Sequence, residues 1–107
     1  MVNKIERTRN TNDSADTNDI SLNSSTAVIV SPANDKRIFI QINNNNSAHS
    51  FWVRLYPANQ DNVKHGIFVS SKTGMTPVWE MPADNFYTGE ISAIAETDSP
   101  IAYVTEY

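Results

Sequence analysis

Short apolar runs separated by turn residues follow one another from Thr26 to the end of the chain. They are rich in β-branched and aromatic side chains and are bounded by Pro, Asn, Asp, Ser and Gly, a pattern typical of β-strands. Seven strands are predicted, over residues 26–31, 37–43, 50–56, 66–70, 76–81, 89–96 and 101–107. No uninterrupted stretch has the spacing of an amphipathic helix, so the chain is expected to be all-β. Seven short strands fit a β-sandwich or a small jelly-roll-like barrel.

Alternation within two of these runs predicts which side chains form the core, because successive residues of a strand point to opposite faces. The predicted core triplets are Ile38, Ile40 and Ile42 in one run and Phe51, Val53 and Leu55 in the next. In the fifth run Pro77 predicts an edge strand or the start of a strand, since proline cannot donate a ladder hydrogen bond.

The opposite faces of the same two runs combine aromatic side chains with arginine, a mixture that is enriched at protein interfaces. They carry Arg37, Phe39 and Gln41 on one strand and Trp52, Arg54 and Tyr56 on the other. We expect Phe39, Trp52, Arg54 and Tyr56 to bind a partner. The alternative is that a loop or the N-terminal region covers this face.

Residues 1–25 differ in composition from the rest of the chain, and they are expected to form a polar N-terminal arm ahead of a β-domain at residues 26–107. Asn, Asp, Ser and Thr dominate the arm, and so little apolar surface cannot offset the entropy of ordering it. A segment that is disordered alone can fold along a neighbouring protein. We therefore expect partner contacts from its basic tip and its apolar residues, namely Lys4, Arg7, Arg9, Ile20 and Leu22.

Charge and composition exclude several functions. The formal net charge of −4 and the pI near 4.9 disfavour binding of nucleic acid through its phosphates. The absence of cysteine removes disulfides, thiolate zinc sites and cysteine nucleophiles. No window approaches the roughly 20 apolar residues that span a bilayer, so no membrane partner and no secretory signal are expected.

Catalytic signatures are equally sparse. His49 and His65 both fall in loop-like sequence, where solvated histidines are expected rather than a metal site with a carboxylate such as Asp61. No serine lies in a G-x-S-x-G elbow, and the three glycines form no phosphate-binding loop. Four glutamates fall in or at the end of predicted strands, where outward-facing charges are favoured over an acid/base pair; they are Glu80, Glu90, Glu96 and Glu106. We expect no enzyme activity, catalytic residue, metal or cofactor.

The order of several motifs resembles that of small virion proteins of tailed bacteriophages. The motifs are ANDKR at residues 33–37 leading into IFIQINNN, then FWVRLYP, Gly66 before IFV, the Trp79-Glu80 pair, GEISAIA and a terminal YVTEY. The resemblance covers residues 26–107 and implies a β-sandwich that decorates the capsid or lies in the head-tail region. It implies a virion location after assembly in the bacterial cytoplasm, with the major capsid protein or other virion proteins as partners and a homo-oligomer, such as a trimer, as the working state.

Two functions of different classes follow. The first is a capsid decoration or cement subunit that binds and stabilises the head shell through its arm and its β-domain surface; a tail or neck accessory protein is a variant of it. The alternative is a carbohydrate-binding or adhesin-like module that stacks sugar rings on Trp52, Tyr56 or Trp79, since aromatic rings offer large apolar area at low entropy cost.

Overall fold

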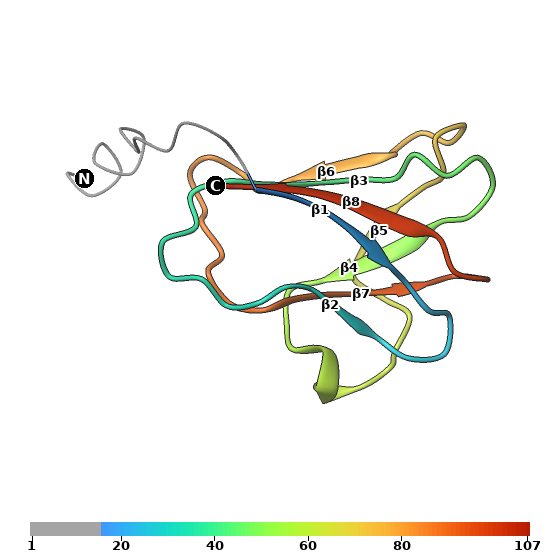
Figure 1. Cartoon of the computed structure of the whole chain (residues 1–107), viewed down its shortest axis with the longest axis horizontal. Helices are drawn as coiled ribbons and strands as arrows, with labels where there is room; N and C mark the ends of the chain where they lie inside the picture. Colours follow the sequence, from blue (N-terminus) through green and yellow to red (C-terminus); the bar gives the residue numbers. More distant parts are fainter. Residues whose placement is uncertain (1–15) are drawn as a thin grey trace.

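The computed structural model describes residues 16–107, which form two facing four-stranded sheets (Figure 1). The elements are β1 (Asp16–Ser21), β2 (Val28–Ser31), β3 (Ile40–Asn43), β4 (Phe51–Arg54), the 3-10 turn η1 (Ala58–Gln60), β5 (Ile67–Val69), β6 (Val78–Glu80), β7 (Ile91–Ala95) and β8 (Ile101–Glu106). Each of the seven predicted strand ranges contains one of the strands β2 to β8. The all-β class is confirmed.

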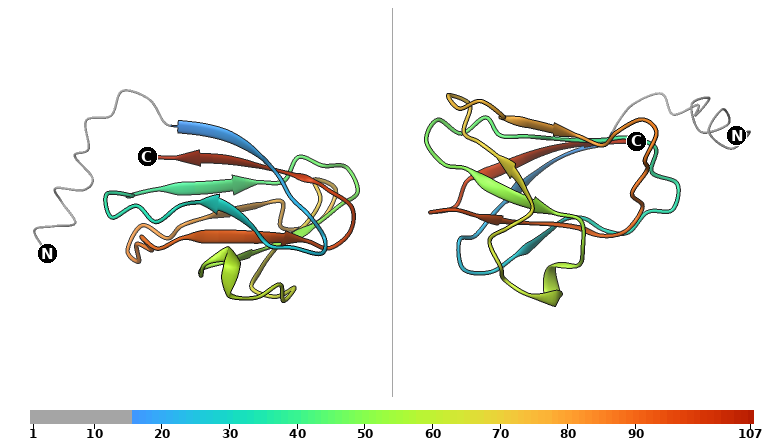
Figure 2. Two further views of the ribbon diagram at one scale, coloured as in Figure 1. Left: turned by 60° about the horizontal axis from the view of Figure 1, so that its bottom comes forward. Right: turned by 180° about the vertical axis from the view of Figure 1, so that it is seen from behind.

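The strand order defines how the chain winds between the sheets. Sheet I has the order β1-β8-β3-β6 and sheet II the order β2-β7-β4-β5, with all neighbours antiparallel. Only β4 and β5 are consecutive neighbours in one sheet; every other connection crosses between sheets, as the two views of Figure 2 show. This order is that of an eight-stranded jelly roll, in which β1 to β4 pair in turn with β8 to β5. Because β6 is an edge strand, the expectation drawn from Pro77 is confirmed.

The core lies between the sheets and is formed by the inward-facing positions of each strand. Ile40 and Ile42 of β3 and Phe51 and Val53 of β4 are fully buried, as the alternation predicts. The third member of each predicted triplet differs, because Ile38 precedes β3 and Leu55 follows β4, where the alternation no longer applies. Ile38 is half-buried, and Leu55 is 37% exposed.

Strand β1 places the start of the fold earlier than expected. The predicted arm extended to residue 25, but Asp16–Ser21 pair with β8 over their whole length, from Asp16 opposite Glu106 to Ser21 opposite Ile101. The following residue, Leu22, is only 2% exposed and joins the core. The described domain therefore begins at residue 16. The remaining arm, residues 1–15 with Lys4, Arg7 and Arg9, lies outside the described residues.

Across residues 16–107, no helix has the length and apolar character needed to cross a membrane.

Candidate partner-binding surfaces

The six predicted partner-binding residues within the described region do not share one surface. Leu22 and Arg54 are 2% and 1% exposed, so the structure corrects their assignment: both are interior residues. Ile20 is half-buried against the core. The remaining three, Phe39, Trp52 and Tyr56, are half-buried in three different environments.

Trp52 lies on the outer face of sheet II, where it packs on Phe68. The two residues are directly opposite each other on β4 and β5, and their ring centroids are 5.2 Å apart. Phe68 is 43% exposed although it is a large apolar side chain in the middle of a strand. Paired aromatic rings at a surface offer apolar contact area with little side-chain entropy to lose. This aromatic pair is therefore a candidate contact surface.

Residues 55–66, here called the cover segment, lie against the same outer face and bury Arg54. The guanidinium donates to Asp61 Oδ1 at 2.9 Å and to the Val63 carbonyl at 3.2 Å, while its Nε donates to Ser92 Oγ at 3.0 Å. Figure 1 shows the segment with η1 outside sheet II. Of the two interpretations left open by the sequence, the one in which a loop covers the face holds for Arg54.

The cover segment ends at Gly66, whose φ of 117° is rarely accessible to residues with a side chain. A Cβ atom at this position would also collide with the Val53 carbonyl oxygen. Further hydrogen bonds attach the segment to the rest of the domain; in two of them Ala58 N donates to Glu90 Oε2 at 2.6 Å and Lys64 Nζ donates to the Glu96 carbonyl at 2.9 Å. The segment is thus a built layer of the fold.

Tyr56 belongs to a polar cluster within this segment. Its hydroxyl donates to Asp61 Oδ1 at 3.0 Å and is hydrogen-bonded to His65 Nε2, and the Arg54 guanidinium lies 4.4 Å from its ring centroid. Desolvation and the hydrogen bond to Asp61 raise the pKa of Tyr56, whereas the hydrogen bond from the Val63 amide lowers the pKa of Asp61. These contacts join residues at both ends of the cover segment and hold it in place.

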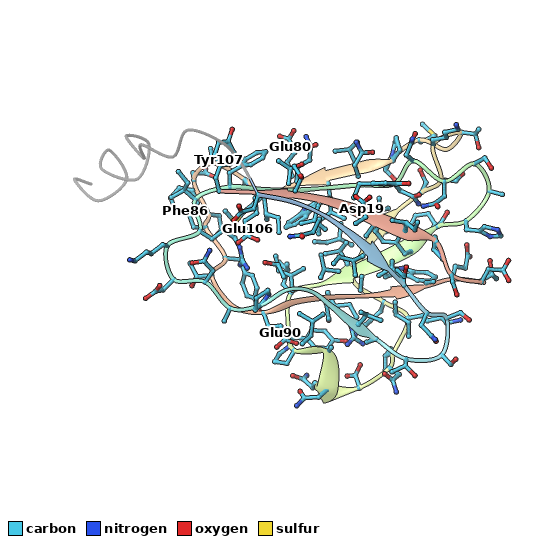
Figure 3. All side chains as sticks on the ribbon, viewed as in Figure 1. Asp19, Glu80, Phe86, Glu90, Glu106 and Tyr107 are labelled. Atoms are coloured by element: carbon cyan, nitrogen blue, oxygen red, sulfur yellow. The ribbon has the colours of Figure 1, made fainter. Side chains whose placement is uncertain are left out.

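Phe39 lies at one end of sheet I beside an apolar groove. Its ring packs edge-to-face on Tyr107, with centroids 5.4 Å apart. The groove has a volume of about 300 Å³ and is lined by Ile38, Phe39, Met81, Pro82, Ala83 and Phe86, with Glu80 as its one charged residue. Figure 3 shows Phe86 and Tyr107 at the end of the molecule where the chain terminates. This end groove is the second candidate contact surface.

Sequence reasoning missed a buried ion pair near the same end. Arg37 was expected on an outward face, but it is 0% exposed and its Nε donates to Glu106 Oε2 at 2.8 Å. Its other nitrogens donate to four further oxygens, those of Ser31 Oγ and of the Pro32, Tyr87 and Gly89 carbonyls. Arg37 and Glu106 are 69 residues apart in the chain, so no local sequence pattern predicts that they form an ion pair.

Glu106 is held in its ionised form by this network. Partial burial alone would raise its pKa, but hydrogen bonds from Ser31, Arg37 and Asn34 outweigh that effect, and the pKa of Glu106 lies below its usual value. The expectation of an outward-facing charge is therefore wrong for Glu106. Among the other strand glutamates, Glu80 and Glu96 are exposed, whereas Glu90 is half-buried and caps η1.

The histidines occupy different surroundings. His49 Nδ1 is 3.2 Å from Thr97 Oγ1 and its Nε2 is 3.3 Å from Asp98 Oδ2, whereas His65 is bonded to Tyr56. Within residues 16–107, no group of three or more His, Cys, Asp or Glu side chains is arranged to hold a metal ion.

Comparison with protein-family models, curated proteins and solved structures finds no match. The resemblance to virion proteins thus rests on the motifs of this chain alone. From the described residues, the structure offers two apolar candidate surfaces, the Trp52 and Phe68 pair on sheet II and the end groove beside Phe39.

Proposed function

We propose that the chain is a virion structural protein, a capsid decoration or cement subunit that attaches to a larger shell. The observation that carries the proposal is the surface aromatic pair of half-buried Trp52 and exposed Phe68, next to Arg54, which the cover segment buries. Large side chains near the centre of an interface, Trp among the foremost, are the residues that contribute most to protein association.

Two features support this class of function. The jelly roll is an architecture that viral capsid domains use, although the fold alone does not identify a function. The motif order of residues 26–107 resembles small virion proteins of tailed bacteriophages. On this proposal the partners are the major capsid protein or other virion proteins, the subunit forms a homo-oligomer, the protein has no catalytic activity, and its location is the virion.

The attachment surface is tested with particles that were assembled without the protein. They are incubated with purified variants, and the number of subunits bound to each particle is measured. Phe68→Ala and Trp52→Ala should each weaken binding by about 2 kcal/mol, or about 30-fold in affinity. Met75→Ala is the matched control, because Met75 is 97% exposed and is not part of the pair. Circular dichroism establishes that each variant is folded.

A chain lacking residues 2–15 tests the remaining arm separately, since this deletion spares β1 and Leu22. The proposal predicts a folded domain with reduced particle occupancy. Full occupancy for all three variants, Phe68→Ala, Trp52→Ala and the deletion, would exclude attachment through these parts of the molecule.

The carbohydrate-binding alternative is narrowed by the structure. Trp79 of β6 lies opposite Ile42 of β3 and is half-buried against the core, which disfavours it as a stacking platform. Trp52 and Tyr56, both half-buried, remain as candidate stacking platforms. Glycan-array binding that disappears in Trp52→Ala but persists in Met75→Ala would favour this alternative over shell attachment.

A further inference from the structure

The end groove has the chemistry of a site for an extended segment that is apolar and basic. Its walls are the side chains of Ile38, Phe39, Met81, Pro82 and Phe86. Glu80, an exposed residue of β6, supplies a carboxylate whose Oε1 accepts a hydrogen bond from Gln41 Nε2 at 2.9 Å. Phe86 and Glu80 both lie toward the end of the molecule that also holds the C-terminal Tyr107 (Figure 3).

The start of β1 lies level with this groove when one follows the register across the strands of sheet I. Asp16 is opposite Glu106, Glu106 is opposite Ile40, and the Ile40 carbonyl accepts the hydrogen bond of Met81 N at 3.0 Å. Three strand spacings separate Asp16 from Met81, which corresponds to about 14 Å. Five extended residues span about 17 Å. Residues 11–15 are therefore sufficient to reach the groove, and ten residues remain to occupy it.

The composition of those ten residues complements the groove. They contain the apolar side chains of Met1, Val2 and Ile5, and three cations, Lys4, Arg7 and Arg9, against the single anion Glu6. Residues 16–107 contain ten Asp and Glu and five Lys and Arg, a net charge of −5. Two of those five cations, Arg37 and Arg54, are buried in ion pairs with Glu106 and Asp61, so the net charge of −5 is carried by the other charged side chains.

We propose that the end groove binds the N-terminal segment of its own chain, with Val2 and Ile5 against the apolar walls and a cation of the segment beside Glu80. Attachment within one chain is favoured because a short tether gives an effective concentration in the millimolar range, which a second copy reaches only in concentrated solution. This inference concerns the free subunit and goes beyond the proposed shell attachment.

The absence of cysteine makes a spin-label experiment direct. A nitroxide is attached to Thr8→Cys in the full chain, and amide signals are compared between its oxidised and reduced forms by NMR. The expected result is a loss of signal intensity at Phe39, Met81 and Phe86. A label at Asn45→Cys, an exposed residue in the loop that follows β3, is the control and should leave these three signals intact.

A second variant separates binding from the mere proximity of a tether. In the spin-labelled chain carrying Val2→Ser and Ile5→Ser, the intensities at the groove should recover, because the apolar anchors are gone while the tether is unchanged. Glu80→Lys should give a partial recovery by reversing the charge at the rim.

Equal signal loss with and without Val2→Ser and Ile5→Ser would overturn the proposal. Mixing spin-labelled chains with isotope-labelled chains that lack the nitroxide tests whether the segment instead binds a second copy. Signal loss at the groove of the isotope-labelled chains in that mixture would overturn attachment within one chain, whereas intact signals there support it.

Discussion

Replacing Glu106 by alanine removes the carboxylate that neutralises a fully buried guanidinium. Arg37 is 0% exposed and its Nε is 2.8 Å from Glu106 Oε2. Breaking a buried ion pair by deleting one partner costs about 3 to 5 kcal/mol, because the other charge is left without compensation. The Glu106 side chain is still 16% exposed, so water can reach the vacated position. We therefore expect the lower end of this range, about 3 kcal/mol.

This loss is large enough to measure by urea unfolding and by thermal denaturation. For a domain of this size each kcal/mol lowers Tm by about 4 to 8 °C, so Glu106→Ala should unfold about 12 to 24 °C earlier. The control is Glu80→Ala on the same sheet, an exposed carboxylate that accepts a hydrogen bond from Gln41. Its stability should stay within about 0.5 kcal/mol of the unmodified chain.

A loss below about 1 kcal/mol in Glu106→Ala, with an unchanged urea m-value, would refute the reasoning from a buried pair. The double variant Arg37→Met and Glu106→Leu adds a second check. Apolar replacement of an isolated buried pair is often neutral. Here Arg37 also donates to the carbonyls of Pro32, Tyr87 and Gly89, and each abandoned carbonyl costs about 1 to 3 kcal/mol. The double variant should therefore remain clearly less stable than the unmodified chain.

Two further predictions concern the pH dependence of stability and the contribution of Leu22, which directly follows β1. The folded pKa of Glu106 lies below its unfolded value, so the stabilisation that its carboxylate gives the domain is complete above the unfolded pKa near 4.3 and is lost as the pH falls through the folded pKa. The difference in unfolding free energy between the unmodified chain and Glu106→Gln, measured by urea unfolding, should therefore narrow below about pH 4. A constant difference would contradict a lowered pKa for Glu106. Leu22→Ala should destabilise the domain by roughly 3 kcal/mol in the same assay, because it deletes a core side chain that is 2% exposed; a value near zero would show that β1 and Leu22 are not part of the folded unit.

The strands were predictable where their residues carry the pattern locally. Ile40, Ile42, Phe51 and Val53 alternate with polar or half-buried neighbours, and the structure buries all four. Strand β1 carries no such signal: its sequence DTNDIS has one apolar side chain, and as an edge strand it is held by β8 on one side only. Its partner β8 lies 80 to 90 residues later in the chain, from Ser21 opposite Ile101 to Asp16 opposite Glu106, a pairing that composition cannot reveal.

The candidate surfaces were predictable only in part, for a different reason. Alternation places Arg54 on the outer face of sheet II together with Trp52, as the sequence indicates. Alternation does not predict that the cover segment buries Arg54 and leaves Trp52 half-exposed. Leu55 and Ile38 show the same limit, because each lies just beyond the end of a strand, where the period of two no longer decides which side chain is buried.

The two buried arginines suggest how this chain divides its polar and apolar residues. Arg37 donates to the carbonyls of Tyr87 and Gly89 in the distant β6–β7 connection, and Arg54 donates to oxygens of the cover segment that directly follows its own strand. The two arginines thus hold these segments in place. Neither guanidinium is available to a partner. The two candidate surfaces carry aromatic side chains instead, with Phe68 beside Trp52 on one and Phe86 and Phe39 lining the other, on a domain whose net charge is negative. The proposed attachment through these surfaces should therefore depend on apolar contact and respond weakly to salt, whereas a contribution from Lys4, Arg7 and Arg9 should weaken as salt is added.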